Sequence, residues 1–395
     1  MPIKGCKFNQ LVIKGLNVYS KSTVLEKSAV QIVDNTIKNV GNFDFNESDI
    51  KVLEFPSNWH LLPGMIDMHV HGAAGADTMD ATDAALHKIS NALVKEGVTS
   101  FLATTTTAKS YDIENALQRV ASYVTNKQDM HRAEILGINL EGPFLSHEKP
   151  GAQESEQFIS PSVDLFKHWQ KMSGNLIKIV TVAPEIDGGL ELIEYLFNHN
   201  IIASMGHSNA SYEQASIAIQ KGCTYATHLF NGMRGIHHRD PGLVTALLLN
   251  DEVTTETIAD CVHTHPAMLK LIWKLKGPDK IVLITDAMRA KYLNDSNYKL
   301  GTKSVIVKNN QARLANGTLA GSVLGMDFAV RNMLKFTDCT LLDIIKMTSE
   351  NPAKQLGVFS RKGSIDIGKD ADLVVMDENM RVRMTICRGN VLFSV

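Results

Sequence analysis

Eight apolar runs, each followed by a helical pattern, constrain the fold of this 395-residue chain more than any other feature. The alternation of strand-like runs with amphipathic segments such as 113–124 and 190–198 is typical of βαβ units around a parallel sheet. Six of the eight runs end in His, Glu or Asp, and the ends are His69, Thr104, Glu141, Ala183, His207, His228, Asp260 and Asp286. Because barrel strands end at one mouth, where functional side chains gather, the pattern predicts a (β/α)8 TIM-like barrel.

A doubly wound open sheet is the main structural alternative, because it also alternates strands with helices. Its binding crevice draws on fewer strand ends and commonly includes a glycine-rich first turn, so the barrel accounts for more of the polar residues. We expect the barrel over residues 63–357. Turn signals at Asn309-Asn310 and Asn316-Gly317 predict a hairpin between 298 and 321 that projects from the barrel rim.

Both ends of the chain show the short apolar–polar alternation of hairpin strands. Such strands need partners for their backbone N–H and C=O groups. We therefore predict that residues 1–62 and 358–395 together form a second, small β-sandwich domain.

The charge balance argues against nucleic acid or an anionic membrane as a partner, because the net charge of −2 comes from 40 basic and 42 acidic side chains without a long run of one sign. Residues 1–19 contain three lysines and show neither a continuous apolar segment nor a small-residue cleavage site. No uninterrupted apolar stretch reaches the roughly 18 residues of a membrane span. We expect a cytoplasmic protein.

Histidines and a glutamate at the strand ends have the pattern of metal ligands. His69 and His71 are two apart in a strand and share a face, so both imidazoles could converge on one ion. Each polar strand end, taken alone, could simply be a residue whose hydrogen bonds are satisfied. Together, Glu141, His207 and His228 form the ligand set of a catalytic divalent ion that keeps a position open for water. His69 and His71 could then hold a second ion, bridged by Glu141.

Asp286 follows the apolar run 281–285, where a carboxylate needs a partner or a task. It could cap the next helix. Beside a metal site it would instead be the general base, which takes a proton from the attacking water and passes it to the leaving amine. The other strand-end ligands favour the catalytic role.

A cluster of basic and small residues follows His228: Asn231, Gly232, Arg234, His237, His238 and Arg239. A solvated loop is the simplest interpretation. In a chain without a global positive field, however, a local cluster near a candidate site favours anion binding, and arginine with free backbone N–H groups suits phosphate.

These motifs resemble the amidohydrolase superfamily and, within it, the N-acetylglucosamine-6-phosphate deacetylases. The resemblance extends from Pro63-Gly64-Met65-Ile66-Asp67 to Ala371-Asp372-Leu373-Val374. The motifs most typical of the deacetylases are Leu140-Glu141-Gly142-Pro143-Phe144, Gly206-His207-Ser208, Thr227-His228-Leu229-Phe230-Asn231, Ile258-Ala259-Asp260 with His263, and Leu319-Ala320-Gly321-Ser322.

The resemblance implies hydrolysis of the acetamide of N-acetylglucosamine 6-phosphate. By this analogy the principal metal is held by Glu141, His207 and His228, and Asp286 is the acid–base. The analogy also implies substrate contacts, with phosphate at Asn231, Gly232 and Arg239 and the sugar at His263. Family members are commonly homodimers, in which Arg239 could reach the neighbouring subunit's site.

Two positions vary within this family. Some relatives lack the pair His69 and His71, so the resemblance allows one or two divalent ions per subunit. Gln153 stands where some relatives have a histidine near the scissile carbonyl. The ligands suit zinc, iron, manganese and cobalt alike. The competing functions are another amidohydrolase activity, such as a cyclic-amide hydrolase or a deaminase, and a non-catalytic scaffold, which usually loses metal ligands.

Overall fold

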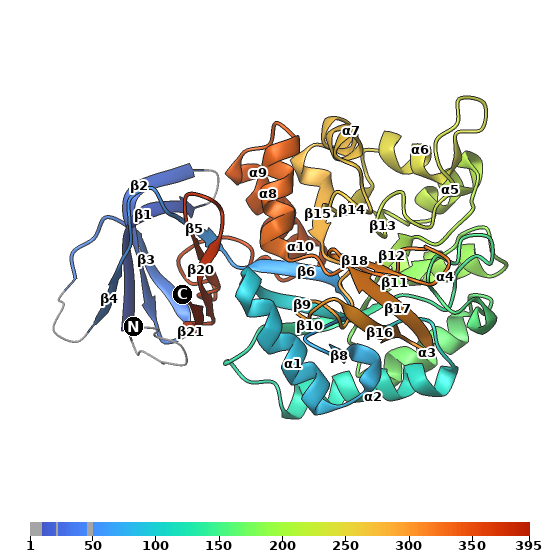
Figure 1. Cartoon of the computed structure of the whole chain (residues 1–395), viewed down its shortest axis with the longest axis horizontal. Helices are drawn as coiled ribbons and strands as arrows, with labels where there is room; N and C mark the ends of the chain where they lie inside the picture. Colours follow the sequence, from blue (N-terminus) through green and yellow to red (C-terminus); the bar gives the residue numbers. More distant parts are fainter. Residues whose placement is uncertain (1–9, 21–22, 46–49) are drawn as a thin grey trace.

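The computed structural model describes residues 10–20, 23–45 and 50–395. Its centre is a sheet of eight parallel strands (Figure 1). In sheet order these are β6 (Met65–Val70), β9 (Val98–Thr104), β10 (Glu134–Leu140), β11 (Ile177–Val182), β12 (Ile202–Met205), β13 (Tyr225–Ala226), β14 (Thr254–Ile258) and β15 (Ile281–Ile284). All strand ends predicted from the sequence lie within two residues of those observed.

The first and last strands meet at their carboxyl ends. The backbone N–H of Asp286 donates to the carbonyl of His69 at 2.8 Å, and His71 N–H donates to the Ala287 carbonyl at 2.9 Å. A parallel bridge also joins Val70 to Ala287. The sheet therefore closes into a barrel at this end, which confirms the barrel over the open sheet.

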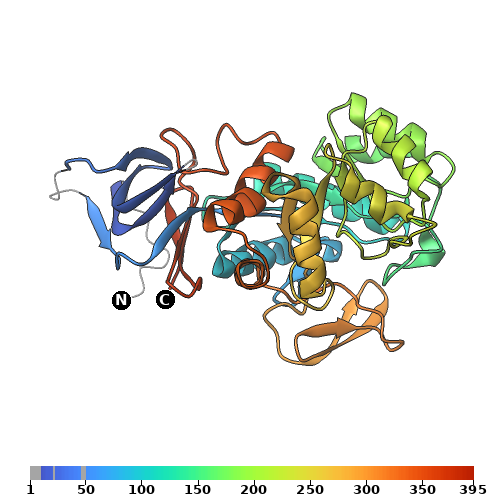
Figure 2. The ribbon, with the colours of Figure 1, turned by 90° about the horizontal axis from the view of Figure 1, so that it is seen from above.

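Helices and short helical turns connect the strands and surround the barrel (Figures 1 and 2). They are η2 (Thr78–Asp80), α1 (Asp83–Leu93), η3 (Val94–Glu96), α2 (Ser110–Asn126), η4 (Ser155–Gln157), α3 (Val163–Met172), α4 (Gly189–Asn198), α5 (Tyr212–Gln220), α6 (Gly242–Leu249), α7 (Pro266–Lys276), η5 (Pro278–Lys280), α8 (Met326–Phe336), α9 (Leu341–Ile345), η6 (Lys346–Glu350) and α10 (Asn351–Gln355). Within the described ranges, no helix combines the length and apolar character needed to cross a bilayer.

Strands from both ends of the chain form a second, mostly antiparallel sheet, as predicted. They are β1 (Gln10–Ser20), β2 (Thr23–Val33), β3 (Thr36–Gly41), β4 (Lys51–Glu54), β5 (His60–Pro63), β19 (Leu373–Met376), β20 (Val382–Cys387) and β21 (Asn390–Ser394). The N-terminal and C-terminal parts join where β5 pairs with β19. One apolar core, with Leu11 and Ile386 among its members, draws on both parts. Hydrogen bonds run continuously through all eight strands, so the predicted sandwich is a single sheet around this core.

We propose the domain division 1–62 plus 358–395 against 63–357 on the basis of these two sheets. Leu62 and Val374 of the terminal sheet share an apolar cluster with Leu93 and Val98 of the barrel, so the two domains pack firmly together. Residues 1–9, on which the expected lack of an apolar leader segment partly rests, lie outside the described residues.

The predicted rim hairpin is a three-stranded antiparallel sheet, which consists of β16 (Ser296–Leu300), β17 (Lys303–Lys308) and β18 (Gln311–Arg313). Figure 2 shows it extending away from the barrel helices. Lys303 Nζ donates to the Gln153 carbonyl at 2.6 Å, and Thr302 Oγ1 donates to the Glu154 carboxylate at 2.5 Å. This sheet is therefore attached to the loop after β10. A two-stranded ribbon, β7 (Gly72–Ala73) and β8 (Ala76–Asp77), follows β6.

Candidate active site

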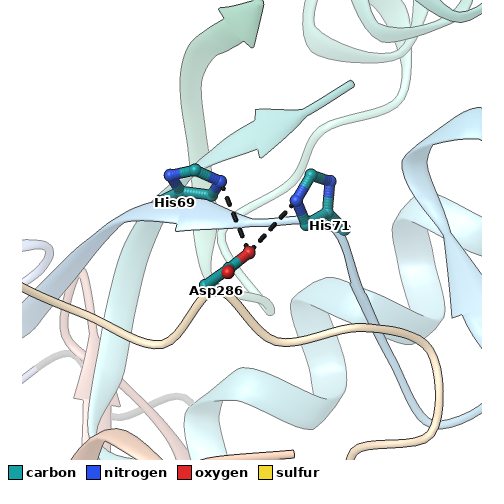
Figure 3. Close-up of side chains that lie close together, drawn as sticks. All are labelled: His69, His71 and Asp286. Atoms are coloured by element: carbon teal, nitrogen blue, oxygen red, sulfur yellow. Dashed lines mark ion pairs between the residues drawn. The ribbon is translucent and has the colours of Figure 1, made fainter. Parts of the chain in front are cut away.

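Two groups of potential metal ligands meet at the carboxyl mouth of the barrel. One consists of His69, His71 and Asp286, and the other of Glu141, His207 and His228. Figure 3 shows the first group, in which both imidazoles point to the Asp286 carboxylate. The Nε2 atoms of His69 and His71 lie 3.5 and 3.2 Å from Asp286 Oδ1. The barrel thus brings together side chains that are more than two hundred positions apart in the sequence.

The Glu141 carboxylate lies between the two groups. Its Oε1 is 3.2 Å from His207 Nε2 and 3.0 Å from His228 Nε2. Its Oε2 is 3.2 Å from His71 Nε2 and 3.7 Å from His69 Nε2. Each oxygen thus faces a different pair of imidazoles, which is the arrangement a bridging carboxylate needs.

Outer hydrogen bonds orient three of the four imidazoles. His207 Nδ1 donates to the Lys149 carbonyl at 2.9 Å, and His69 Nδ1 donates to the Glu256 carboxylate at 3.0 Å. The Nδ1 of His71 lies 3.1 Å from Thr106 Oγ1. A proton on Nδ1 leaves the Nε2 lone pair for a metal, so His69 and His207 are held in the ligand tautomer.

Three of these residues have a left-handed backbone conformation. The φ angles of His207, His228 and Asp286 are +46°, +27° and +48°. Such conformations cost roughly 1–3 kcal/mol each in a non-glycine residue and cluster at functional sites. They turn the chain sharply where each strand ends, which directs the side chain into the mouth of the barrel. Hydrogen bonds hold them in place, for example Ser322 N–H to the Asp286 carbonyl at 2.7 Å.

Three carboxylates are buried here without a strong cation beside them. Glu141, Glu256 and Asp286 are 2%, 0% and 8% exposed. Their ion-pair partners are imidazoles, and none of the described Lys or Arg side chains pairs with them. Buried negative charge of this density needs compensation. One or two divalent cations would supply it, and the carboxylate and imidazole donors fit such ions.

The buried carboxylates and imidazoles also shift one another's pKa values. Burial opposes a charge on His71, but hydrogen bonds and charge from Asp286 and Glu141 raise its pKa to about 9. Burial would raise the pKa of Asp286, but the charge of His69 and the hydrogen bond from His71 lower it to about 2. Protons on the imidazoles, or a divalent cation, can therefore neutralise the negative charge of the same carboxylates.

A cavity of about 330 Å³ opens above the two groups. The predicted site residues that line it are His71, Glu141, Gln153, His207, His228, Asn231, Gly232, His263 and Asp286. His69 lies beneath this layer and is fully buried. Gly232 has a φ of +60°, and a Cβ there would lie 2.8 Å from His207 Nδ1. Only glycine fits this close approach while it leaves the imidazole in place.

Two polar side chains of the cavity wall are held by carboxylates. His263 Nδ1 donates to Asp260 Oδ2 at 2.6 Å, which leaves Nε2 for a ligand. Gln153 Nε2 donates to Glu141 Oε2 at 2.7 Å, and Gln153 Oε1 accepts from Thr107 N–H at 2.9 Å. The Gln153 amide is thus fixed beside the Glu141 carboxylate.

Arg239 is the one predicted site residue that the fold does not bring to this cavity. It is exposed, and its guanidinium contacts His238 Nε2 at 2.7 Å. Another cation, Arg313 of β18, lines the cavity instead. It donates to Gln311 Oε1 at 3.0 Å and to the Gly317 carbonyl at 2.7 Å. The described carboxylates include no ion-pair partner of Arg313.

Sequence reasoning missed Arg313 and Glu256. Arg313 lies in the rim segment, where no strand-end rule points to function. Glu256 stands in the middle of Thr254–Ile258, a strand whose five residues are all buried. A lone carboxylate in a strand whose other residues are three threonines and one isoleucine was the available signal for Glu256.

Comparison with known proteins agrees with this geometry. The model of the amidohydrolase family matches residues 60–392. The N-acetylglucosamine-6-phosphate deacetylase of Bacillus subtilis is 46% identical over 384 residues, which cover 97% of each chain. The chain belongs to this family of deacetylases within the amidohydrolases.

Two further relatives bear on the ligand. An aspartate-to-alanine variant of the Mycobacterium smegmatis N-acetyl-D-glucosamine-6-phosphate deacetylase, solved in complex with N-acetyl-D-glucosamine-6-phosphate, has a TM-score of 0.90 at 30% identity. The match covers 99% of this chain and 100% of that one. The N-acetylgalactosamine-6-phosphate deacetylase of Escherichia coli O157:H7 is 38% identical over 329 residues, 83% of this chain and 86% of that protein.

Proposed function

We propose that this chain is a metal-dependent hydrolase that converts N-acetyl-D-glucosamine 6-phosphate into D-glucosamine 6-phosphate and acetate. One observation carries the proposal: Asp286 lies with four imidazoles and Glu141 at the floor of a cavity whose wall includes Arg313. The Bacillus subtilis relative bears the name of this activity.

The mechanism follows from the positions of the side chains. A divalent ion held by Glu141, His207 and His228 would act as a Lewis acid on the acetyl carbonyl and make water more acidic. The Asp286 carboxylate lies beside the two groups of ligands, 3.5 Å from His69 Nε2, where it would accept the proton of the attacking water. It then gives this proton to the sugar nitrogen as the C–N bond breaks. The hydrogen bond from Ser322 N–H to the Asp286 carbonyl, at 2.7 Å, holds this residue in place.

The phosphate binds at the part of the cavity wall that Asn231, Gly232 and Arg313 form. Asn231 and Gly232 lie in the loop after His228, and the Arg313 guanidinium has no carboxylate partner among the described residues. Arg239 points outside its own cavity, so we assign it to the site of a second copy of the chain in a homodimer. Binding energy from the phosphate orients the distant amide for attack.

The remaining assignments are also proposals. His69 and His71 would hold a second divalent ion beside Glu141. Zinc, iron, manganese and cobalt all suit the ligands. The substrate and product are small metabolites, and we place the protein in the cytoplasm.

Acetate release from N-acetyl-D-glucosamine 6-phosphate tests the proposal. We expect activity in the metal-loaded protein, its loss with a chelator and its loss in Asp286→Asn. Activity that survives both changes would contradict the chemistry. The Escherichia coli relative makes N-acetyl-D-galactosamine 6-phosphate the second substrate to compare. A cyclic amide turned over in preference to both sugars would favour another amidohydrolase activity.

A further inference from the structure

We propose that Glu256 is the positioning residue that enables His69 and His71 to hold a second divalent ion. The inference deepens the proposed function, because it rests on the metal-dependent site described above. Glu256 lies on β14, far from either ligand in the sequence, and its side chain is fully buried.

A single oxygen of Glu256 serves both groups of ligands. Its Oε2 accepts from His69 Nδ1 at 3.0 Å and from the backbone N–H of His228 at 3.1 Å. His69 belongs to one group of ligands and His228 to the other. The contact with His228 also holds its left-handed backbone, with φ at +27°. Glu256 thus fixes the relative position of the two groups.

The hydrogen bond from His69 decides which nitrogen faces the site. A proton held on Nδ1 by Glu256 leaves the Nε2 lone pair directed at Glu141 and Asp286, at 3.7 and 3.5 Å. These distances are too long for a hydrogen bond, and the buried His69 Nε2 has no hydrogen-bond partner in the described part of the chain. A cation between these three side chains would give that nitrogen its partner.

Charge distinguishes Glu256 from the outer partners of the other ligands. His207 donates to a carbonyl and His71 contacts a hydroxyl, both of which are neutral. When a carboxylate accepts the N–H of a metal-binding imidazole, the imidazole becomes a stronger ligand and its tautomer is fixed. The Glu256 carboxylate pairs with His69, and none of the described Lys or Arg side chains pairs with it. An ion bound through His69 would therefore also stabilise the buried carboxylate.

The test measures metal content and affinity, independently of turnover. Metal-free parent and Glu256→Gln protein are titrated with zinc by calorimetry, and bound zinc is counted by plasma mass spectrometry after dialysis. We expect two ions per parent chain. In Glu256→Gln we expect one tightly bound ion and a second bound about 10- to 100-fold more weakly, the usual effect of losing an outer-shell partner. Cobalt substitution adds a signature: magnetic coupling between paired ions in the parent, lost in the variant.

Two further variants separate positioning from general damage. Thr257→Val changes the neighbouring residue of β14 and should keep both ions. The double variant His69→Gln, Glu256→Gln should bind the second ion no more weakly than His69→Gln alone, if Glu256 acts through His69. Should Glu256→Gln fail to fold, Glu256→Asp withdraws the carboxylate from His69 and should weaken the second ion likewise.

The proposal is overturned if Glu256→Gln binds two ions with parental affinity, or if the parent binds only one at saturating zinc. Either result leaves the deacetylase activity open to its own assay. Conversely, a parent with two ions but no acetate release would contradict the proposed function and leave the role of Glu256 standing.

Discussion

The backbone N–H of Asp286 donates a hydrogen bond to the His69 carbonyl at 2.8 Å, and this contact joins the last strand of the barrel to the first. The side chains of the same two residues lie 3.5 Å apart. The bond that closes the barrel therefore also sets the distance between the proposed general base and a proposed metal ligand. Stability and chemistry depend on the same contact here.

Replacement of Asp286 by Asn tests the general base. The amide has the same shape but cannot accept the proton of the attacking water, so we expect kcat to fall by about 10²- to 10⁴-fold. The metal bound at Glu141, His207 and His228 should remain, which elemental analysis would verify. Asp279→Asn, an exposed site outside the cavity, serves as the control. A kcat within a few-fold of the parent would remove Asp286 from the mechanism.

Metal affinity should increase with pH. The pKa of His71 is raised to about 9, so in the metal-free protein this imidazole carries a proton at neutral pH and must release it to bind an ion. We therefore expect zinc or cobalt affinity to rise between pH 6 and about pH 9, with protons released on binding. Calorimetry in buffers of different ionisation enthalpy would count these protons. A binding constant independent of pH would show that His71 is not a ligand.

The strand-end ligands could be predicted because barrel geometry alone brings them together. His207 and His228 each follow a buried strand, and all such ends meet at one mouth. Glu256 could not be placed in this way, because its role depends on the direction of its side chain within β14 and on the position of His69 across the barrel. Sequence spacing records neither of these.

The rim sheet of β16, β17 and β18 also shows that sequence spacing does not specify tertiary placement. Turn signals predicted that a hairpin would project, but not that it would return Arg313 to the cavity. That placement depends on tertiary contacts, such as the one between Lys303 and the Gln153 carbonyl. The terminal strands were likewise predictable as one domain. Their arrangement as one continuous sheet depends on the pairing of β5 with β19, which apolar alternation does not specify.

Arg313→Gln should weaken recognition of the phosphate. The variant removes a cation of the cavity wall that has no described carboxylate partner, and a charge-assisted hydrogen bond of about 1.5–3 kcal/mol corresponds to a 10- to 150-fold rise in KM. We expect this rise for N-acetyl-D-glucosamine 6-phosphate and little change for N-acetyl-D-glucosamine. Arg331→Gln, whose guanidinium pairs with Asp327 on α8, is the control. Equal effects on both sugars would exclude a phosphate contact.

Arg239→Ala should also raise KM for the phosphorylated sugar, but through a second subunit. Mixing the Arg239→Ala and Asp286→Asn chains tests this assignment. A mixed dimer contains one site with an intact Asp286 from one chain and an intact Arg239 from the other. We expect the mixture to recover up to about a quarter of parental activity, from the random pairing of chains in a C₂ dimer. A mixture with only the summed activities of its components, or a monomer in sedimentation, would contradict the assignment.

Glu134 at the start of β10 should make stability sensitive to acid. Its carboxylate receives Arg361 at 2.7 Å and Lys362 at 2.8 Å, from the segment that leads to the terminal sheet. Burial would raise the pKa of Glu134, but these hydrogen bonds and charges lower it to about 2. A lowered pKa stabilises the fold above the unfolded-state value of about 4.5, and this contribution is lost as the pH falls towards 2.

We therefore expect the parent to exceed Glu134→Gln in unfolding free energy by an amount of order 3 kcal/mol at pH 7, as the shift implies. The difference should shrink steadily below pH 5, in thermal or urea unfolding of the metal-loaded proteins. Glu26→Gln, at an exposed position of β2, should show no such trend. If the difference between parent and Glu134→Gln stays constant from pH 7 to pH 3, the link from Glu134 to Arg361 and Lys362 contributes nothing through its charge.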